Sequence, residues 1–283
     1  MSIQLRSLTA ATFCERVVPA LLEREAENSL LIGIAHRVAT SSESTADVLF
    51  LSIEEEGAVV GATVWGPPHE VVITRMPPGA IALVADYCVA SGWPVAGATG
   101  PDAIGLQLAE ALADRTHTTV RRRACQRVYE LTSVDDVPRV AGAMRRAVPD
   151  DLQFIATWYA AFAQEVNMAH PMNPPDWARA TIASGSAFLW DDGTARCLAC
   201  LPRETPNGRA IGPVYTPPTA RRQGYATSLV AALAEHVLAS GKRFACLFTD
   251  DDNATSNHIY ESIGFRFVCR FDAYALVPAS GPR

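Results

Sequence analysis

The predicted elements of this 283-residue chain follow one order twice, and this repeat limits the fold more than any single motif does. In the first half, an apolar run at 48–53 is followed by an acidic turn that ends in glycine and by a second apolar run at 58–65. In the second half, the runs at 186–190 and 195–201 flank a turn of the same kind. Acidic residues and glycine between two apolar runs are typical of β-hairpins.

The same further elements are predicted after each hairpin. They are strand 69–76, helix 80–91, strand 94–98 and helix 101–115 in the first half, and strand 209–216, helix 224–240, strand 243–249 and helix 253–262 in the second. Helical segments at 12–27 and 150–165 open the halves, and strands at 119–131 and 266–277 are expected to close them. We therefore expect an α/β (α+β) protein of two domains, each with a mixed, mostly antiparallel sheet flanked by helices.

A polar segment around Ser133–Pro138 marks the predicted boundary between the halves. Residues 141–146 after it have the pattern of a first strand, so we expect domains at 1–134 and 140–283. A chain of this length is long enough for two domains of ordinary size.

Composition favours a reduced, cytoplasmic protein. The formal net charge is −6, which argues against the basic surface of a nucleic-acid-binding protein. No apolar run approaches the roughly 18 residues of a membrane span, and the N-terminus lacks the apolar core of a signal peptide. The seven cysteines are odd in number and scattered. Cys197 and Cys200 are expected on opposite faces of one strand, with no second pair to complete a metal site, so no metal is predicted.

A strand, a basic turn and the start of a helix follow one another at 214–226, and this arrangement is suited to holding a phosphate. The helix has apolar residues at the spacing of one face, and its first turn offers backbone N–H groups without intrahelical partners. Gly224 has no side chain to obstruct a diphosphate, and Arg221 and Arg222 supply positive charge. Pro217 and Pro218 lack backbone N–H groups, so we expect the strand ladder to end there and the strands to separate.

Two motifs in the second half resemble those of the GNAT superfamily of acyl-CoA-dependent N-acetyltransferases. The first, R-x-x-G-x-A, is Arg221 to Ala226. The second, N-x-x-[AS]-x-x-[LI]-Y-x-x-x-G-F, consists of Asn253, Ser256, Ile259, Tyr260, Gly264 and Phe265. The resemblance covers about residues 141–277, and the first half resembles the same fold only in its order of elements, in a tandem arrangement.

The resemblance implies that acetyl-CoA is the co-substrate and assigns residues to it. The diphosphate is expected at Arg221, Arg222, Gln223, Gly224, Tyr225 and Ala226. The pantetheine arm is expected at the backbone of Val214, Tyr215 and Thr216, with Asn253 and Ser256 also at the cofactor. Asn253 is equally suited to capping its helix.

The chemistry requires a deprotonated amine and a protonated leaving thiol, because an amine of the lysine type has a pKa of about 10.4 and a thiol one of about 8.5. The resemblance implies direct attack without an acyl-enzyme, with Tyr260 as the acid beside the CoA sulfur. The general base is left open among Glu165, Glu204, Asp250 and His170. Of these, Glu165 is the candidate taken forward with Tyr260 as catalytic.

The first half lacks both motifs. Met76-Pro77-Pro78-Gly79-Ala80 stands where the basic turn would be, so a non-catalytic copy is expected there. The predicted function is transfer of acetyl from acetyl-CoA to an amine: a polyamine, an aminoglycoside, a lysine side chain or a peptide N-terminus. The alternatives are a non-catalytic acyl-CoA-binding regulatory module and an acyltransferase that uses a longer acyl-CoA. Neither a nucleic-acid nor a membrane partner is expected, and the sequence does not define an oligomeric state.

Overall fold

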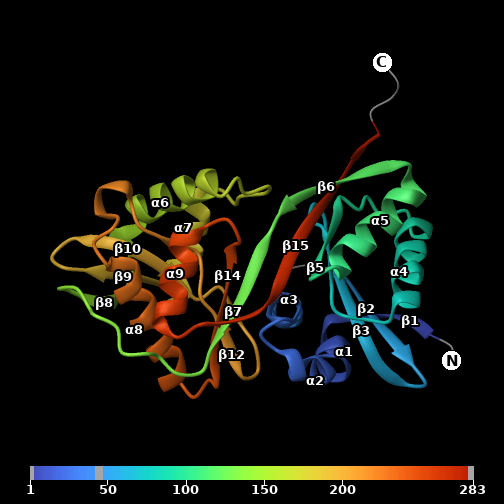
Figure 1. Ribbon diagram of the computed structural model, residues 1–283, viewed down its shortest axis with the longest axis horizontal. Coiled ribbons are helices and arrows are strands. Elements are labelled where there is room, and N and C mark those ends of the chain that lie inside the picture. The colour runs from blue at the N-terminus through green and yellow to red at the C-terminus, as the bar shows by residue number, and fades with distance from the viewer. Residues whose placement is uncertain (1–2, 42–46, 280–283) are drawn as a thin grey trace. The chain divides into compact units, whose positions relative to one another are not determined.

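The computed structural model of the chain describes residues 3–41 and 47–279 (Figure 1). Residues 1–2, 42–46 and 280–283 lie outside the described residues, and with them the start of the first predicted domain and the end of the second. The chain forms two compact units, and neither is one continuous stretch. The first contains the described residues of Met1–Val128, Asp250–Asp252 and Val268–Arg283, and the second contains Tyr129–Thr249 and Asn253–Phe267.

The first unit is a sheet with helices on both faces. Its elements are β1 (Ile3–Leu8), α1 (Ala10–Arg16), α2 (Val18–Leu21), α3 (Ser29–Thr40), β2 (Leu49–Glu55), β3 (Ala58–Trp65), β4 (Val71–Ile73), α4 (Pro78–Ala90), β5 (Gly97–Pro101), α5 (Ile104–Thr116) and β6 (Thr118–Ala124). On β2, Phe50 contacts Phe13 of α1, whereas Ile53 packs in the cluster of α4 and α5. Because residues an odd number apart on a strand point to opposite faces, α1 and the α4–α5 pair cover different faces.

The first unit also contains most of the C-terminal strand β15 (Arg266–Pro278). Phe271 to Ala275 pair with β5, and Ala273 to Pro278 pair with β6, both antiparallel. The expectation that 266–277 closes the sheet of the second half is therefore wrong for these residues. The apolar pattern of a strand predicts that it pairs, but the choice of neighbour depends on contacts across more than 150 residues of chain.

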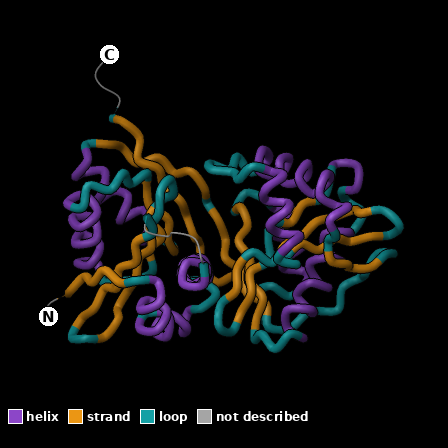
Figure 2. Tube along the Cα trace, turned by 180° about the vertical axis from the view of Figure 1, so that it is seen from behind, coloured by secondary structure: helices purple, strands orange, loops and turns teal. Residues whose placement is uncertain are grey.

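The second unit is built from a later set of elements. They are β8 (Ala143–Arg146), α6 (Leu152–Glu165), α7 (Pro174–Ala183), β9 (Ala187–Asp191), β10 (Ala195–Cys200), β11 (Arg203–Glu204), β12 (Gly208–Ala210), β13 (Val214–Tyr215), α8 (Tyr225–Ala239), β14 (Phe244–Asp250) and α9 (Ala254–Ile263). The strand β7 (Gln126–Leu131) contains the chain boundary between the units. Figure 2 shows the helices in purple and the strands in orange.

An antiparallel sheet of order β13-β10-β9-β8 lies between helices in the second unit. One face packs on α8 through a cluster that contains Cys197, and the other packs on α6 and α7 through a cluster that contains Cys200. The prediction that these two cysteines occupy opposite faces of one strand is thus confirmed, and both thiols are buried and free. The mixed, mostly antiparallel sheets with flanking helices confirm the expected fold class.

The predicted strand 209–216 is divided in two, and this division positions the candidate site. The first part, β12, pairs in parallel with β14, and the second part, β13, pairs antiparallel with β10. The N–H of Ile211 still donates to Cys246 of β14, at 2.8 Å, whereas the N–H of Gly212 donates to Cys200 of β10, also at 2.8 Å. After Ile211 the chain therefore leaves β14, and a gap opens between β13 and β14. The strands separate before Pro217 and Pro218, the prolines expected to end the ladder.

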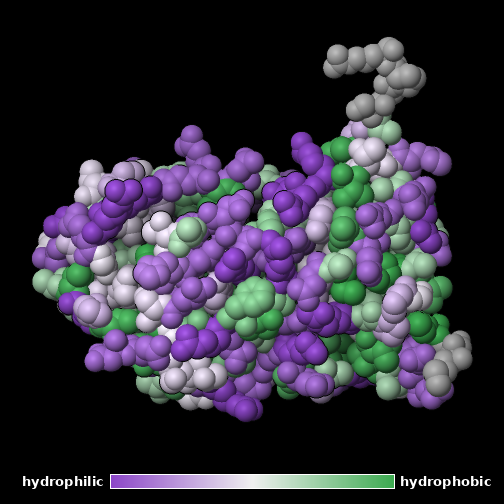
Figure 3. All heavy atoms as spheres, viewed as in Figure 1, coloured by the Kyte–Doolittle hydropathy of each residue, from purple (hydrophilic) through white to green (hydrophobic). Residues whose placement is uncertain are grey.

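Hydrophilic residues cover most of the face seen in Figure 3, with hydrophobic ones scattered among them. Within the described part of the chain, no helix has both the length and the apolar composition needed to cross a membrane.

The helix α3, which was not predicted from the sequence, is almost wholly buried on one side, with Leu31, Ile32 and Ala35 in the core.

Candidate functional site

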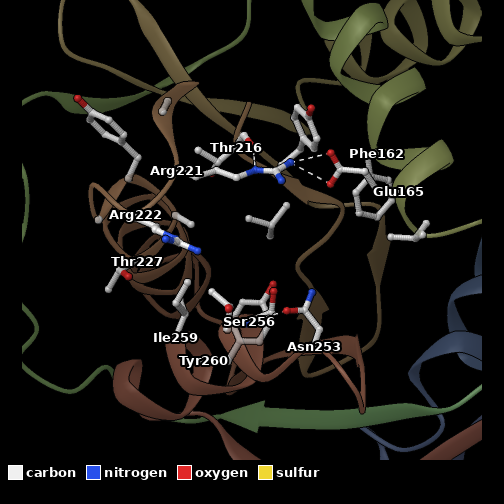
Figure 4. Close-up of a pocket in the computed structure, with 18 residues that line it drawn as sticks. Phe162, Glu165, Thr216, Arg221, Arg222, Thr227, Asn253, Ser256, Ile259 and Tyr260 are labelled. Atoms are coloured by element: carbon white, nitrogen blue, oxygen red, sulfur yellow. Dashed lines mark hydrogen bonds and ion pairs between the residues drawn. The ribbon is translucent and has the colours of Figure 1, made fainter. Parts of the chain in front are cut away.

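A cavity of about 590 Å³ opens in the second unit where β13 has parted from β14. Its volume lies in the range usual for small-molecule sites. The cavity is lined by the ends of four elements: Phe162, Glu165 and Val166 at the end of α6; Val214, Tyr215 and Thr216 of β13; Ala220, Arg221, Arg222, Gly224, Tyr225, Ala226 and Thr227 around the start of α8; and Asn253, Thr255, Ser256, Ile259 and Tyr260 of α9 (Figure 4).

The structure brings together almost every residue singled out from the sequence. Of the candidate site residues, all but Gln223 line this cavity. Gln223 instead directs its side-chain amide to the carbonyl of Thr219, at 3.2 Å. Among the candidates for the base, Glu165 lines the cavity, whereas Glu204, Asp250 and His170 are not among the lining residues. Glu204 pairs with Lys242.

The turn before α8 has the backbone geometry of a ligand-binding loop. Gly224 is the N-cap of α8 with φ of +84°, and a Cβ there would lie 2.9 Å from a methyl group of Val140. Arg222 also has a positive φ, +61°, which is unusual for a residue with a side chain. The turn presents the first N–H groups of a 15-residue helix to the cavity, at the positive end of its dipole.

The two arginines of this turn differ in their bonding partners. Arg221 donates to both carboxylate oxygens of Glu165, at 2.7 and 2.9 Å, and its Nε donates to the carbonyl of Thr216, at 2.9 Å. Its guanidinium also lies 5.7 Å from the ring centre of Tyr215. Arg222 is exposed and has no ion pair with any residue that the structure describes. Figure 4 shows the bonds of Arg221 as dashed lines and none on Arg222.

Tyr260 lies buried in the wall of the cavity, on α9. Burial raises the pKa of its phenol well above the usual value, the nearby Cys197 raises it further, and a hydrogen bond with Ser256 opposes the shift. The phenol is therefore protonated throughout the physiological range. Asn253 caps α9, because its side-chain oxygen accepts from the N–H of Ser256 at 3.0 Å, and it also lines the cavity.

A buried thiol stands behind the cavity wall. The hydroxyl of Thr216 donates to Sγ of Cys197, at 3.1 Å. Burial raises the pKa of Cys197 to about 12, so this thiol is neutral at pH 7 and has no thiolate to act as a nucleophile. Within the described residues, no group of three or more His, Cys, Asp or Glu is arranged to hold a metal ion.

Tyr225 is fixed to the β9–β10 hairpin. Its hydroxyl donates to Asp192 at 2.8 Å, and Arg196 lies over its ring at 5.9 Å. This hydrogen bond lowers the pKa of the Asp192 carboxyl and raises the pKa of the phenol. The first residue of α8 is thereby held in place from its side-chain end, independently of the helix backbone.

Sequence reasoning missed the apolar walls of the cavity. Phe162 and Val166 flank Glu165 on and just after the last turn of α6. Ile259, which was recognised only as a motif residue, also lines the cavity beside Tyr260 on α9. The spacing of Phe162, three residues before Glu165, is the signal that could have identified it, because residues at i and i+3 share one face of a helix. Thr227 and Thr255 had no such signal.

Comparisons with known proteins agree with the fold. Residues 196–273 match the family model described as FR47-like protein. Similar solved structures include a GNAT-family acetyltransferase from Colwellia psychrerythraea (13% identity, TM-score 0.57, covering 96% of this chain and 99% of that one), a tandem GNAT protein from the clavulanic acid biosynthesis pathway (15%, 0.55, 99% and 100%) and a Drosophila protein (14%, 0.69, 98% and 99%). A search of curated proteins finds no match.

These likenesses extend over nearly the whole length of each protein compared. The resemblance to the GNAT superfamily is confirmed at the level of the fold, in a tandem arrangement.

Proposed function

We propose that the chain is an N-acetyltransferase that transfers the acetyl group of acetyl-CoA directly to an amine, with its chemistry in residues 140–283. The observation that supports this most is the separation of β13 from β14. At that point an open strand edge, the N-terminus of α8 and the buried hydroxyl of Tyr260 face one cavity. The first two suit the binding of an anionic donor that contains amide groups, and the third suits stabilisation of its sulfur as it leaves.

Binding of the donor is assigned to backbone as much as to side chains. The N–H groups of the first turn of α8 and the free charge of Arg222 would take the diphosphate, and Gly224 supplies the left-handed backbone at which this turn enters the helix. The edge of β13 that no longer faces β14 would pair with the amide groups of the pantetheine arm.

In the proposed reaction, the amine nitrogen attacks the thioester carbonyl carbon and the bond from that carbon to sulfur breaks. The departing sulfur receives a hydrogen bond from Tyr260. Because the pKa of this phenol is raised above that of a thiol, the hydrogen bond stabilises the developing thiolate, and the net proton comes from the amine. One such donor typically contributes about 10²- to 10³-fold in rate. Glu165 at the cavity wall is proposed to take a proton from the acceptor ammonium, so that the neutral amine can attack.

The first half, residues 1–134, is proposed to be a non-catalytic copy. Its β4 corresponds in order to β12 and β13 but keeps both neighbours, since Val72 pairs with Val64 of β3 and with Thr99 of β5. No gap therefore opens between these strands. The arginine after β4, Arg75, is bound to Glu27, which is 2% exposed, and to Asp102.

The test is release of free thiol from acetyl-CoA in the presence of an amine panel: a polyamine, an aminoglycoside, a lysine-containing peptide and a peptide with a free N-terminus. The proposal expects turnover with at least one amine and binding of one equivalent of acetyl-CoA per chain. Propionyl-CoA and longer acyl donors in the same assay test the acetyl preference. Binding of acetyl-CoA without turnover of any amine would favour a regulatory acyl-CoA-binding module instead. Failure to bind CoA would refute the proposal.

A further inference from the structure

In this structure Arg221 is bonded to groups that the proposed donor, acetyl-CoA, would need. Its Nη2 donates to both oxygens of Glu165, and its Nε donates to the carbonyl of Thr216. The guanidinium carbon also lies 5.7 Å from the ring centre of Tyr215. The side chain therefore spans from the turn before α8 to the end of α6, as Figure 4 shows.

Two of these contacts compete directly with ligand binding under the proposed function. A diphosphate would accept from two neighbouring nitrogens of the guanidinium, and either such pair includes Nη2, which already donates to Glu165. The carbonyl of Thr216 lies on the strand edge assigned to the pantetheine amides, and Arg221 already donates to it. The ion pair joins residues 56 positions apart and is not a local helix contact.

The carboxylate of Glu165 is affected in the same way. Both of its oxygens accept from Arg221, so an acceptor ammonium would have to share the carboxylate with the guanidinium while the pair is intact. Phe162 and Val166 beside it add an apolar wall, and Val166 is half exposed. A site with one carboxylate on an apolar wall suits an ammonium attached to a hydrocarbon chain or ring.

We infer that Arg221, Glu165 and the Thr216 carbonyl form an autoinhibitory latch across the cavity, which acyl-CoA opens by taking Arg221. This inference rests on the proposed function. Opening the latch transfers Arg221 from Glu165 to the diphosphate and frees the Thr216 carbonyl. The same step releases Glu165 to receive a cationic, partly apolar amine. Glu165 therefore opposes the binding of the donor and favours that of the acceptor. Arg222, which has no ion pair among the described residues, makes the first contact with the anion.

The size of the effect follows from the exposure of the pair. The side chains of Arg221 and Glu165 are 43% and 46% exposed, so solvent screens their attraction. Ion pairs of this kind are weak, and releasing Arg221 from one corresponds to about a two- to fivefold gain in the affinity for CoA.

The experiment measures the affinity of the full-length chain for CoA by titration calorimetry in four forms: wild type, Glu165→Gln, Arg221→Gln and the double variant. A latch predicts that Glu165→Gln binds CoA two- to fivefold more tightly, and that Arg221→Gln weakens binding more in the Glu165→Gln background than in the wild type. Glu235→Gln is the matched control, because Glu235 pairs with Arg139 through a partly exposed contact in the same unit and does not line the cavity.

Two results would overturn the latch while leaving the proposed function intact. One is equal affinity of wild type and Glu165→Gln for CoA. The other is tightening by Glu165→Gln that is just as large when Arg221 is already Gln, since this would reflect repulsion between the carboxylate and the anionic ligand. If no form binds CoA, both the latch and the proposed function are wrong. Thermal unfolding of each variant establishes that the compared forms are folded.

Discussion

The backbone N–H of Ile211 donates to the carbonyl of Cys246, and the N–H of the next residue, Gly212, donates to the carbonyl of Cys200. Two consecutive residues thus bond to two different strands, β14 and β10. The pairing with β14 ends here and β13 continues beside β10 alone, and the cavity of the second unit lies just beyond this point. In the first unit, Val72 bonds in register with strands on both sides, and the corresponding edge is closed.

Removal of the Tyr260 hydroxyl is expected to lower turnover without weakening the binding of acetyl-CoA. Tyr260→Phe keeps the buried ring and loses the donor to the departing sulfur, so we expect kcat to fall about 10²-fold or more. Thiol release and titration calorimetry measure the two quantities. Tyr129→Phe is the control, because Tyr129 is also buried and bonds Glu261 outside the cavity. Turnover by Tyr260→Phe at the wild-type rate would exclude this role.

Substitution of Gly224 by alanine is expected to destabilise the fold and to weaken CoA binding. The residue has φ of +84°, which costs a residue with a Cβ about 1–2 kcal/mol, and its Cβ would also press on Val140. Gly193→Ala is the matched control, since Gly193 has φ of +104° with nothing within 4 Å of an added Cβ. Urea unfolding should show a larger loss for Gly224→Ala, and only that variant should bind CoA less tightly. Equal losses would mean that the contact with Val140 is relieved.

Arg222→Gly is expected to stabilise the fold and at the same time to weaken the binding of CoA. The left-handed backbone at φ of +61° penalises arginine by about 1–2 kcal/mol, while glycine loses about 0.5–1 kcal/mol through its greater freedom in the unfolded chain. We therefore expect the free energy of unfolding to rise by about 0.5 kcal/mol, and the affinity for CoA to fall about tenfold, as for loss of one charged hydrogen bond. Urea unfolding and calorimetry test both signs. Unchanged affinity would remove Arg222 from the proposed site.

The buried thiol of Cys197 is expected to make stability fall at alkaline pH. Its pKa is raised to about 12 by burial, whereas a thiol in the unfolded chain has a pKa of about 8.5. Between these values the unfolded state loses its proton and the folded state keeps it, so the free energy of unfolding falls by about 1.4 kcal/mol per pH unit. Below pH 8.5 the thiol is protonated in both the folded and the unfolded state, so it does not make the stability depend on pH.

Urea unfolding of wild type and Cys197→Ala under reducing conditions, from pH 8 to 10, measures this slope. Above pH 8.5 the free energy of unfolding of the variant should fall less steeply with pH, by the slope that corresponds to one proton, about 1.4 kcal/mol per pH unit. Parallel curves would show that the thiol ionises equally in both states. Because Cys197 is neutral at pH 7, it is not expected to form an acyl-enzyme, and thiol release by Cys197→Ala should continue.

Local sequence patterns were sufficient to predict much of the candidate site. The R-x-x-G-x-A run places a tight turn before a helix because only Gly224 tolerates its backbone angles without strain, and α8 begins there. Asn253 starts α9 by capping it, as its side chain and position predict. The alternation of a strand likewise placed Cys197 and Cys200 on opposite faces. Each of these results depends on residues within a few positions of one another.

The pairing of distant segments could not be predicted from such local patterns. The chain alone determined which segments become helices and strands, and which turn can accept an anion, because sterics, capping and periodicity act over neighbouring residues. Only the tertiary structure decided that Phe271 to Ala275 pair with β5, that the strand at 208–215 divides between two neighbours, and that Glu165 holds Arg221 across 56 residues. Such contacts depend on how many segments pack at once, and no local pattern specifies a partner that lies far along the chain.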